Sequence, residues 1–194
     1  MPFATTVNLQ GLGEPLLNKD LFKMIEYAKS KKIEIGFFTN ATLLTDEIAD
    51  KLIKSNVDYI NISLDAADPK TYEQIRVNAK YDNVMRNIRN FIAKRKQLNI
   101  GIPKISVWTV LFDANYDELP GLVKLAKDID VDEYVVQSAH SWGKDYMKDN
   151  AKREEMDHHY TKTLKLMKEA KRLANQIGLN FRFTTLYPDP QSLR

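Results

Sequence analysis

Gly11-Leu12-Gly13-Glu14-Pro15 is the stretch that decides the fold. An apolar-rich run over residues 5–10 precedes it, and a helical pattern over residues 19–31 follows it. A glycine-rich turn between a strand and a helix lies at the carboxyl end of that strand, where parallel sheets bind ligands. Glycine lets the backbone approach a ligand closely because it has no Cβ, and the Glu14 carboxylate suits an amino group. On this motif alone, a turn whose glycines serve only the backbone is an equal alternative.

The rest of the sequence alternates strand and helix patterns. Strands are expected at residues 5–10, 33–39, 58–64, 104–111, 132–137 and 179–184, and helices at 19–31, from 45, from 69 to about 98, from 115 and at 153–177. Asp68 is expected to cap a helix beginning at Pro69, Asn115 and Glu118 resemble a capping box, and Gly178 is placed to end a helix. Most strands are apolar on both faces, which predicts an α/β protein with a parallel sheet covered by helices. A singly wound partial barrel and a doubly wound sheet both fit.

Composition excludes several classes of function. The 194 residues carry a formal net charge of only +3, and the lysines are scattered over helix faces. A nucleic-acid surface is therefore not expected, and no apolar run reaches the roughly 20 residues that span a bilayer. The chain contains no cysteine, so it has neither disulfides nor thiolate ligands for a metal. A cytoplasmic location is expected.

Four motifs at successive strand ends carry a family resemblance. They are Gly11–Pro15, Thr39-Asn40-Ala41-Thr42-Leu43-Leu44, Ile62-Ser63-Leu64-Asp65-Ala66, and the segment 68–76. Together they resemble the core of a radical S-adenosylmethionine (SAM) enzyme, most closely the SPASM-type subfamily, over about residues 7–111. The resemblance implies a partial TIM-like (β/α)6 barrel with its helices outside over residues 1–187. Residues 188–194 are expected to be a tail or a linker.

The resemblance also implies a SAM site. Seven residues are expected to take part: Gly11, Gly13, Glu14, Pro15, Asn40, Ser63 and Asp65. The glycine–glutamate–proline residues would hold the methionyl amino group, Ser63 and Asp65 the ribose, and Asn40 would face the same cavity. Enzymes of this family cleave SAM to a 5′-deoxyadenosyl radical. That radical abstracts hydrogen from a substrate, here expected to be a peptide, a protein or a small molecule.

One departure from the family is large. The family binds a [4Fe–4S] cluster with a CxxxCxxC loop, and this sequence has no cysteine. The chain is therefore expected to be a fragment that lacks the cluster loop, the first strand–helix unit and a cysteine-rich C-terminal extension, and to be inactive alone. A truncated chain, a split gene product and a degenerate homologue all fit. The strand at residues 5–10 would then be an open edge that associates with a second copy or a partner.

Two other readings of function stay open. The first is a non-catalytic partial barrel that binds a nucleotide-like ligand or a partner. The second is an unrelated TIM-type lyase or hydrolase, in which Glu14 and Asp65 would form an acid–base pair.

Other candidate residues are weaker. His158 and His159 are neighbours on an expected helix and point about 100° apart, so a shared metal is disfavoured. His140, Ser141 and Trp142 follow a strand, where either a ligand contact or an ordinary surface loop fits. Tyr72 and Arg76, one helical turn apart, either pair with each other or pack on the helix surface.

Overall fold

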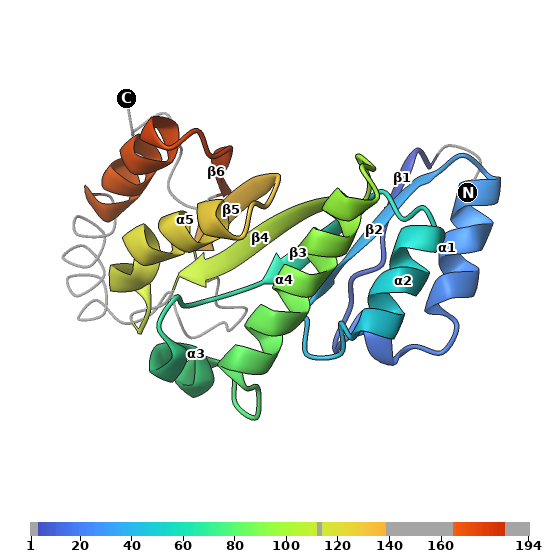
Figure 1. Ribbon diagram of the computed structural model, residues 1–194, viewed down its shortest axis with the longest axis horizontal. Coiled ribbons are helices and arrows are strands. Elements are labelled where there is room, and N and C mark those ends of the chain that lie inside the picture. The colour runs from blue at the N-terminus through green and yellow to red at the C-terminus, as the bar shows by residue number, and fades with distance from the viewer. Residues whose placement is uncertain (1–3, 112–113, 139–164, 185–194) are drawn as a thin grey trace, which may run out of the picture.

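A computed structural model describes residues 4–111, 114–138 and 165–184. These residues form one curved sheet of six parallel strands and the helices that connect them. The strands are β1 (Thr6–Asn8), β2 (Glu34–Thr39), β3 (Tyr59–Ser63), β4 (Lys104–Leu111), β5 (Glu133–Ser138) and β6 (Phe181–Thr184). Their order in the sheet is the order in the sequence, β1 to β6, and every neighbouring pair is parallel. Among the described strands the sheet does not close, and β1 and β6 are its two edges (Figure 1). The singly wound partial barrel is confirmed.

Helices connect successive strands. They are α1 (Leu21–Ser30), α2 (Asp46–Lys54), α3 (Pro69–Ile75), α4 (Tyr81–Gln97) and α5 (Leu119–Asp128), with short 3-10 turns η1 (Pro15–Leu17) and η2 (Tyr116–Glu118) and a further helix over residues 165–176. The Asp68 carboxylate accepts a hydrogen bond from the Thr71 N–H at 2.9 Å, so the predicted cap of α3 is confirmed. Gly178 has a positive φ of 66° and follows the last helix, as predicted.

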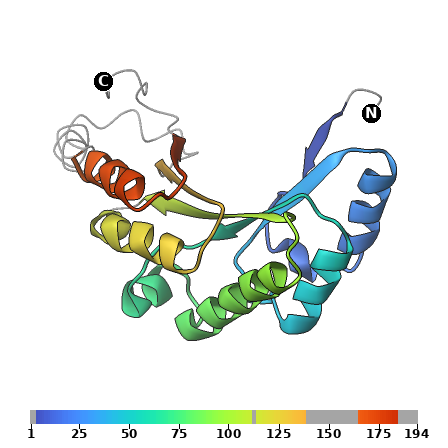
Figure 2. The ribbon, with the colours of Figure 1, turned by 45° about the horizontal axis from the view of Figure 1, so that its top comes forward.

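The hydrophobic core lies between the helices and the convex face of the sheet. Ile60 of β3, for example, pairs with Phe37 and Ile105 on its neighbours, and all three side chains are buried. Figure 2 shows the helices gathered on the convex side, while none of the described helices covers the concave side. The expectation of two apolar faces is wrong for that side. Polar and aromatic side chains such as Asn61 and Trp108 alternate there with the core residues, because an open barrel leaves this face for solvent or a ligand.

Two predicted local features differ from the structure. The single helical region over 69–98 is two helices, because Arg76 leaves the helical conformation (φ −101°, ψ 74°) and Asn78 has a positive φ of 69°. The capping box at Asn115 is wrong as well. The Glu118 carboxylate instead accepts from the backbone N–H groups of Ala67 and Asp68, at 3.2 and 3.1 Å, and so ties the loop after β3 to η2.

Among the residues that the structure describes, no helix is both long enough and apolar enough to cross a membrane. The predicted boundary between a barrel over 1–187 and a tail over 188–194 lies outside the described residues, as does most of the helix expected at 153–177.

Candidate functional site

A cavity of about 450 Å³ opens at the carboxyl ends of the strands, on the concave side of the sheet. Its walls come from five strands, the glycine loop and the end of α3. The lining residues are Asn8, Gln10, Gly11, Gly13, Pro15, Phe38, Ser63, Arg76, Trp108, Val110 and Gln137. Four of the seven residues predicted for a SAM site therefore line one cavity. The other three, Glu14, Asn40 and Asp65, do not belong to this lining and lie around it.

The glycine loop gives the cavity a wall of bare backbone. Gly13 has a φ of +104°, a conformation that side chains other than glycine rarely adopt. A Cβ built at Gly11 or Gly13 meets no atom within 4 Å, so both glycines face open space. Backbone carbonyl oxygens in such a loop are available to a cationic ligand group.

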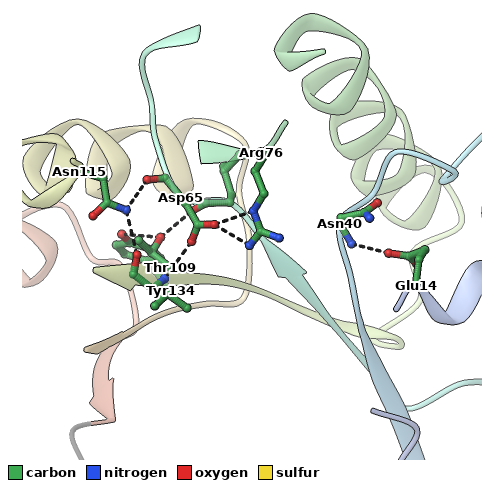
Figure 3. A network of polar contacts seen from close by, with 9 residues as sticks. Glu14, Asn40, Asp65, Arg76, Thr109, Asn115 and Tyr134 are labelled. Carbon is green, nitrogen blue, oxygen red and sulfur yellow. Dashed lines mark hydrogen bonds and ion pairs between the residues drawn. The ribbon is translucent and has the colours of Figure 1, made fainter. Parts of the chain in front are cut away.

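The Glu14 carboxylate joins the glycine loop to the end of β2. Its Oε1 accepts from the Thr39 hydroxyl at 2.7 Å and from the Leu16 N–H at 3.2 Å. Its Oε2 accepts from the Asn40 N–H at 2.8 Å (Figure 3). The carboxylate thus has three donors from the protein itself and holds the loop in place. The sequence assigned Glu14 to a ligand or to an acid–base pair. It did not indicate the contact with Thr39, because Thr39 lies 25 residues away.

Asn40 shapes the turn after β2. Its backbone N–H binds Glu14, and its side-chain Oδ1 accepts from the backbone N–H and the hydroxyl of Thr42, at 2.9 and 2.6 Å. Its predicted contact with SAM stays a prediction, since this side-chain oxygen is engaged within the turn.

Asp65 is buried, with 1% of its surface exposed, and binds Arg76. Its Oδ2 accepts from Arg76 Nε at 2.6 Å and lies 2.5 Å from Arg76 Nη2, while its Oδ1 accepts from the Val110 N–H at 2.9 Å. Arg76 therefore pairs with Asp65 and not with Tyr72, which is fully buried and packs edge-on against the Tyr81 ring. The contact of Asp65 with a ribose stays a prediction.

Arg76 is a functional candidate that the sequence analysis did not assign to the SAM site. It lines the cavity, and 31% of its side chain is exposed although its carboxylate partner is buried. A guanidinium at a cavity wall suits a carboxylate or phosphate group of a ligand. The signal available in the sequence was its position seven residues after Pro69, at the end of a short helix that begins beyond β3.

Ser63 and an aromatic pair complete the wall. The Ser63 hydroxyl makes no hydrogen bond within the described residues, so it is available to a ligand. The rings of Phe38 and Trp108 pack edge to face with centroids 4.9 Å apart. Trp108 Nε1 donates to Ser106 Oγ, which donates to Asn61 Oδ1 at 2.6 Å, so buried polar groups fix the indole ring.

The remaining sequence candidates receive little support. Glu14 and Asp65 direct their carboxylates to separate sets of donors (Figure 3), and this does not favour an acid–base pair. His140, Ser141, Trp142, His158 and His159 lie outside the described residues. Over residues 4–111, 114–138 and 165–184, no three histidine, aspartate or glutamate side chains gather as metal ligands would.

Comparison with known proteins decides the family. The profile of the radical SAM superfamily matches residues 3–126, which include the glycine loop, Ser63, Asp65 and Arg76. The chain belongs to the radical SAM superfamily. Members of this superfamily use SAM and a [4Fe–4S] cluster, and the cysteine-free sequence carries no thiolate for that cluster.

The names of individual relatives indicate different reactions. A probable GTP 3′,8-cyclase of Methanococcus maripaludis is 28% identical over 166 residues, which are 85% of this chain and 50% of the relative. The mycofactocin maturase MftC of Mycolicibacterium smegmatis is 29% identical over 120 residues, 62% of this chain and 29% of the relative. The chain thus spans half the length of the first relative and less of the second.

One solved structure supports the fold. SuiB of Streptococcus suis, bound to S-adenosylmethionine, superposes with a TM-score of 0.64 over 94% of this chain and 38% of SuiB, at 20% identity. At this identity the likeness concerns the fold of the radical SAM barrel alone.

Proposed function

We propose that this chain is the SAM-binding barrel of a radical SAM enzyme. The observation that carries the proposal is the cavity at the strand ends, where the glycine loop, Ser63 and Arg76 meet. Its chemistry fits SAM group by group. The loop carbonyls suit the methionyl ammonium, the Arg76 guanidinium suits the carboxylate, and the Ser63 hydroxyl suits the ribose diol.

The residues do not fit the other group that the superfamily uses. Without cysteine, the chain has no ligands for a [4Fe–4S] cluster. SAM supplies a 5′-deoxyadenosyl group for radical hydrogen abstraction in this superfamily. The proposal for this chain concerns how its own residues bind and orient SAM. We also propose that the whole enzyme is a radical SAM enzyme of the SPASM-type subfamily. Its proposed substrate is a peptide, a protein or a small molecule. The relatives MftC and the probable GTP 3′,8-cyclase support both proposals.

Calorimetry with SAM tests the proposal. Glu14→Gln is expected to weaken binding about tenfold to hundredfold, because it removes the negative charge beside the methionyl ammonium, an interaction worth about 1.5–3 kcal/mol. Ser63→Ala is expected to weaken binding about twofold to tenfold, because a neutral hydrogen bond to the ribose contributes about 0.5–1.5 kcal/mol. Glu47→Gln is the matched control, since Glu47 is an exposed helix residue paired with Lys51. Wild-type affinity in both site variants would refute the assignment of the site.

A second candidate is a non-catalytic barrel that binds a nucleotide-like ligand or a partner. The absence of cysteine favours it, because such a protein needs no cluster. No binding of SAM to the wild-type chain at millimolar concentration, with binding of another adenine nucleotide, would support this candidate over the first.

We also propose association at the β1 edge, with a second copy or another polypeptide. β1 pairs only with β2 among the described strands. On the neighbouring helix α1, Met24 and Tyr27 are 41% and 66% exposed, which adds apolar surface beside the edge. A cytoplasmic location is proposed because a cysteine-free chain has no need of an oxidising compartment.

A further inference from the structure

We infer that Asp65 is a positioning residue for the cavity: it holds the Arg76 guanidinium where the carboxylate of SAM binds, and it makes no contact with SAM itself. This inference rests on the proposed function. It differs from a ribose-binding role for Asp65, and the two roles predict different responses to chemically matched ligands.

The surroundings of Asp65 fix its carboxylate. Leu64 continues the ladder beyond β3, since its N–H donates to the Trp108 carbonyl at 2.9 Å. Asp65 Oδ1 then takes the Val110 N–H at 2.9 Å, so a side chain replaces the backbone acceptor at the point where β3 turns away. Asn115 Nδ2 donates to the carbonyl groups of both Asp65 and Val110, at 2.7 and 2.8 Å.

A second layer of buried hydrogen bonds supports this turn. The Thr109 hydroxyl donates to the Leu64 carbonyl at 2.6 Å, and the Tyr134 hydroxyl donates to Thr109 at 3.1 Å (Figure 3). Tyr134 and Thr109 are both fully buried. This network fixes the backbone around Asp65. To turn toward the cavity, the carboxylate itself would lose the Val110 N–H and both Arg76 contacts, which are costly to leave unmade at a buried position.

The same arrangement occurs twice at the opposite end of the sheet. Asp58, just before β3, accepts from the Ile35 N–H at 2.8 Å and binds Lys29 at 2.6 Å. Asp132, just before β5, accepts from the Ile105 N–H at 2.6 Å and binds Arg95.

The cations at these two positions come from the last turns of α1 and α4 and do not line the cavity. Of these three aspartates, only Asp65, at the carboxyl end of the sheet, binds a cation that lines the cavity. Arg76 uses Nε and Nη2 on Asp65, and within the described residues its Nη1 makes no hydrogen bond, at a partly exposed position. Asp132 is therefore a matched control for a purely structural role.

The test measures binding of two ligands, SAM and decarboxylated SAM, to the 194-residue chain and its variants by calorimetry. The ligands share the sulfonium, ribose and adenine groups, and only SAM carries the carboxylate. Arg76→Gln and Asp65→Asn are each expected to weaken SAM about tenfold to hundredfold and to leave decarboxylated SAM unchanged. Adding Asp65→Asn to Arg76→Gln is expected to cause no further loss. Asp132→Asn is expected to lower the unfolding temperature and leave both affinities unchanged.

Three results would overturn the inference. Equal weakening of both ligands by Asp65→Asn would indicate a ribose contact or a general structural role. Unchanged binding of SAM by Asp65→Asn would show that Arg76 needs no support. A wild-type chain that binds neither ligand would overturn the proposed function together with the inference. If Asp65→Asn does not fold, Arg76→Lys replaces it: this variant keeps the charge and loses the Nε contact, and wild-type affinity for SAM would refute positioning.

Discussion

Replacement of Glu14 by glutamine is expected to destabilise the protein by about 1.5–3 kcal/mol. The carboxylate accepts two hydrogen bonds on Oε1 and one on Oε2. A glutamine keeps one oxygen, so its best orientation retains the Thr39 and Leu16 donors and turns an NH2 group toward the Asn40 N–H. One charge-assisted hydrogen bond is then lost and two donors face each other, which gives the stated magnitude.

Urea or thermal unfolding followed by circular dichroism measures the effect. For a domain of this size the loss corresponds to a fall in Tm of roughly 3–12 °C. Glu47→Gln, which alters an exposed helix pair, should leave Tm unchanged. A Glu14→Gln protein that unfolds at the same temperature as this control would refute the view that the carboxylate joins the glycine loop to β2.

Four further outcomes are expected. Anaerobic reconstitution should give no cluster on the 194-residue chain, because it has no thiolates; stoichiometric iron and sulfide would contradict this. Light scattering should show association that grows with concentration and is reduced by Thr6→Lys, which charges the open β1 edge, whereas a monomer at every concentration would mean that the edge is protected. Gly36→Ala should lower the free energy of unfolding by about 1–3 kcal/mol, because the new Cβ overlaps the Tyr59 carbonyl and ring; unchanged stability would show that β2 and β3 can separate. The Thr71 backbone N–H lowers the pKa of Asp68. The stabilisation by this cap is therefore fully present above the unfolded pKa near 3.9 and is lost as pH falls through the lower folded pKa. Asp68→Asn should flatten the acid limb of a stability–pH curve, and an unaltered limb would exclude Asp68 as its cause.

Elements whose signals are local were predictable from the sequence. All six strands and the cap at Asp68 lie close to their expected positions, since apolar runs and capping residues act over a few neighbours. The order of the strands followed from the family resemblance, since the crossover rule alone left a doubly wound sheet open. The break between α3 and α4 was missed because Asn78 takes up its positive φ without a glycine or proline to mark it.

The site was predictable in its location and less so in its roles. Gly11, Gly13, Pro15 and Ser63 line the cavity as expected, because carboxyl ends of parallel strands share one edge of the sheet. The partners of Glu14 and Asp65 could not be predicted. Thr39, Val110 and Arg76 lie 25, 45 and 11 residues away from them, and a hydrogen bond over such separations depends on tertiary packing that leaves no pattern in the sequence.

The agreement between strand order and chain order has a consequence for how stability is distributed. Each described strand pairs only with the described strands before and after it in the sequence, so the barrel behaves as a one-dimensional array of strand–helix modules, comparable to a solenoid. In such an array each module is stabilised by its nearest neighbours, and the central strands β3 and β4 are supported on both sides while β1 and β6 fray first. The residues that surround the cavity are divided accordingly: Asp65 and Trp108 stand on the most cooperative modules, and the glycine loop stands on the module that opens most readily.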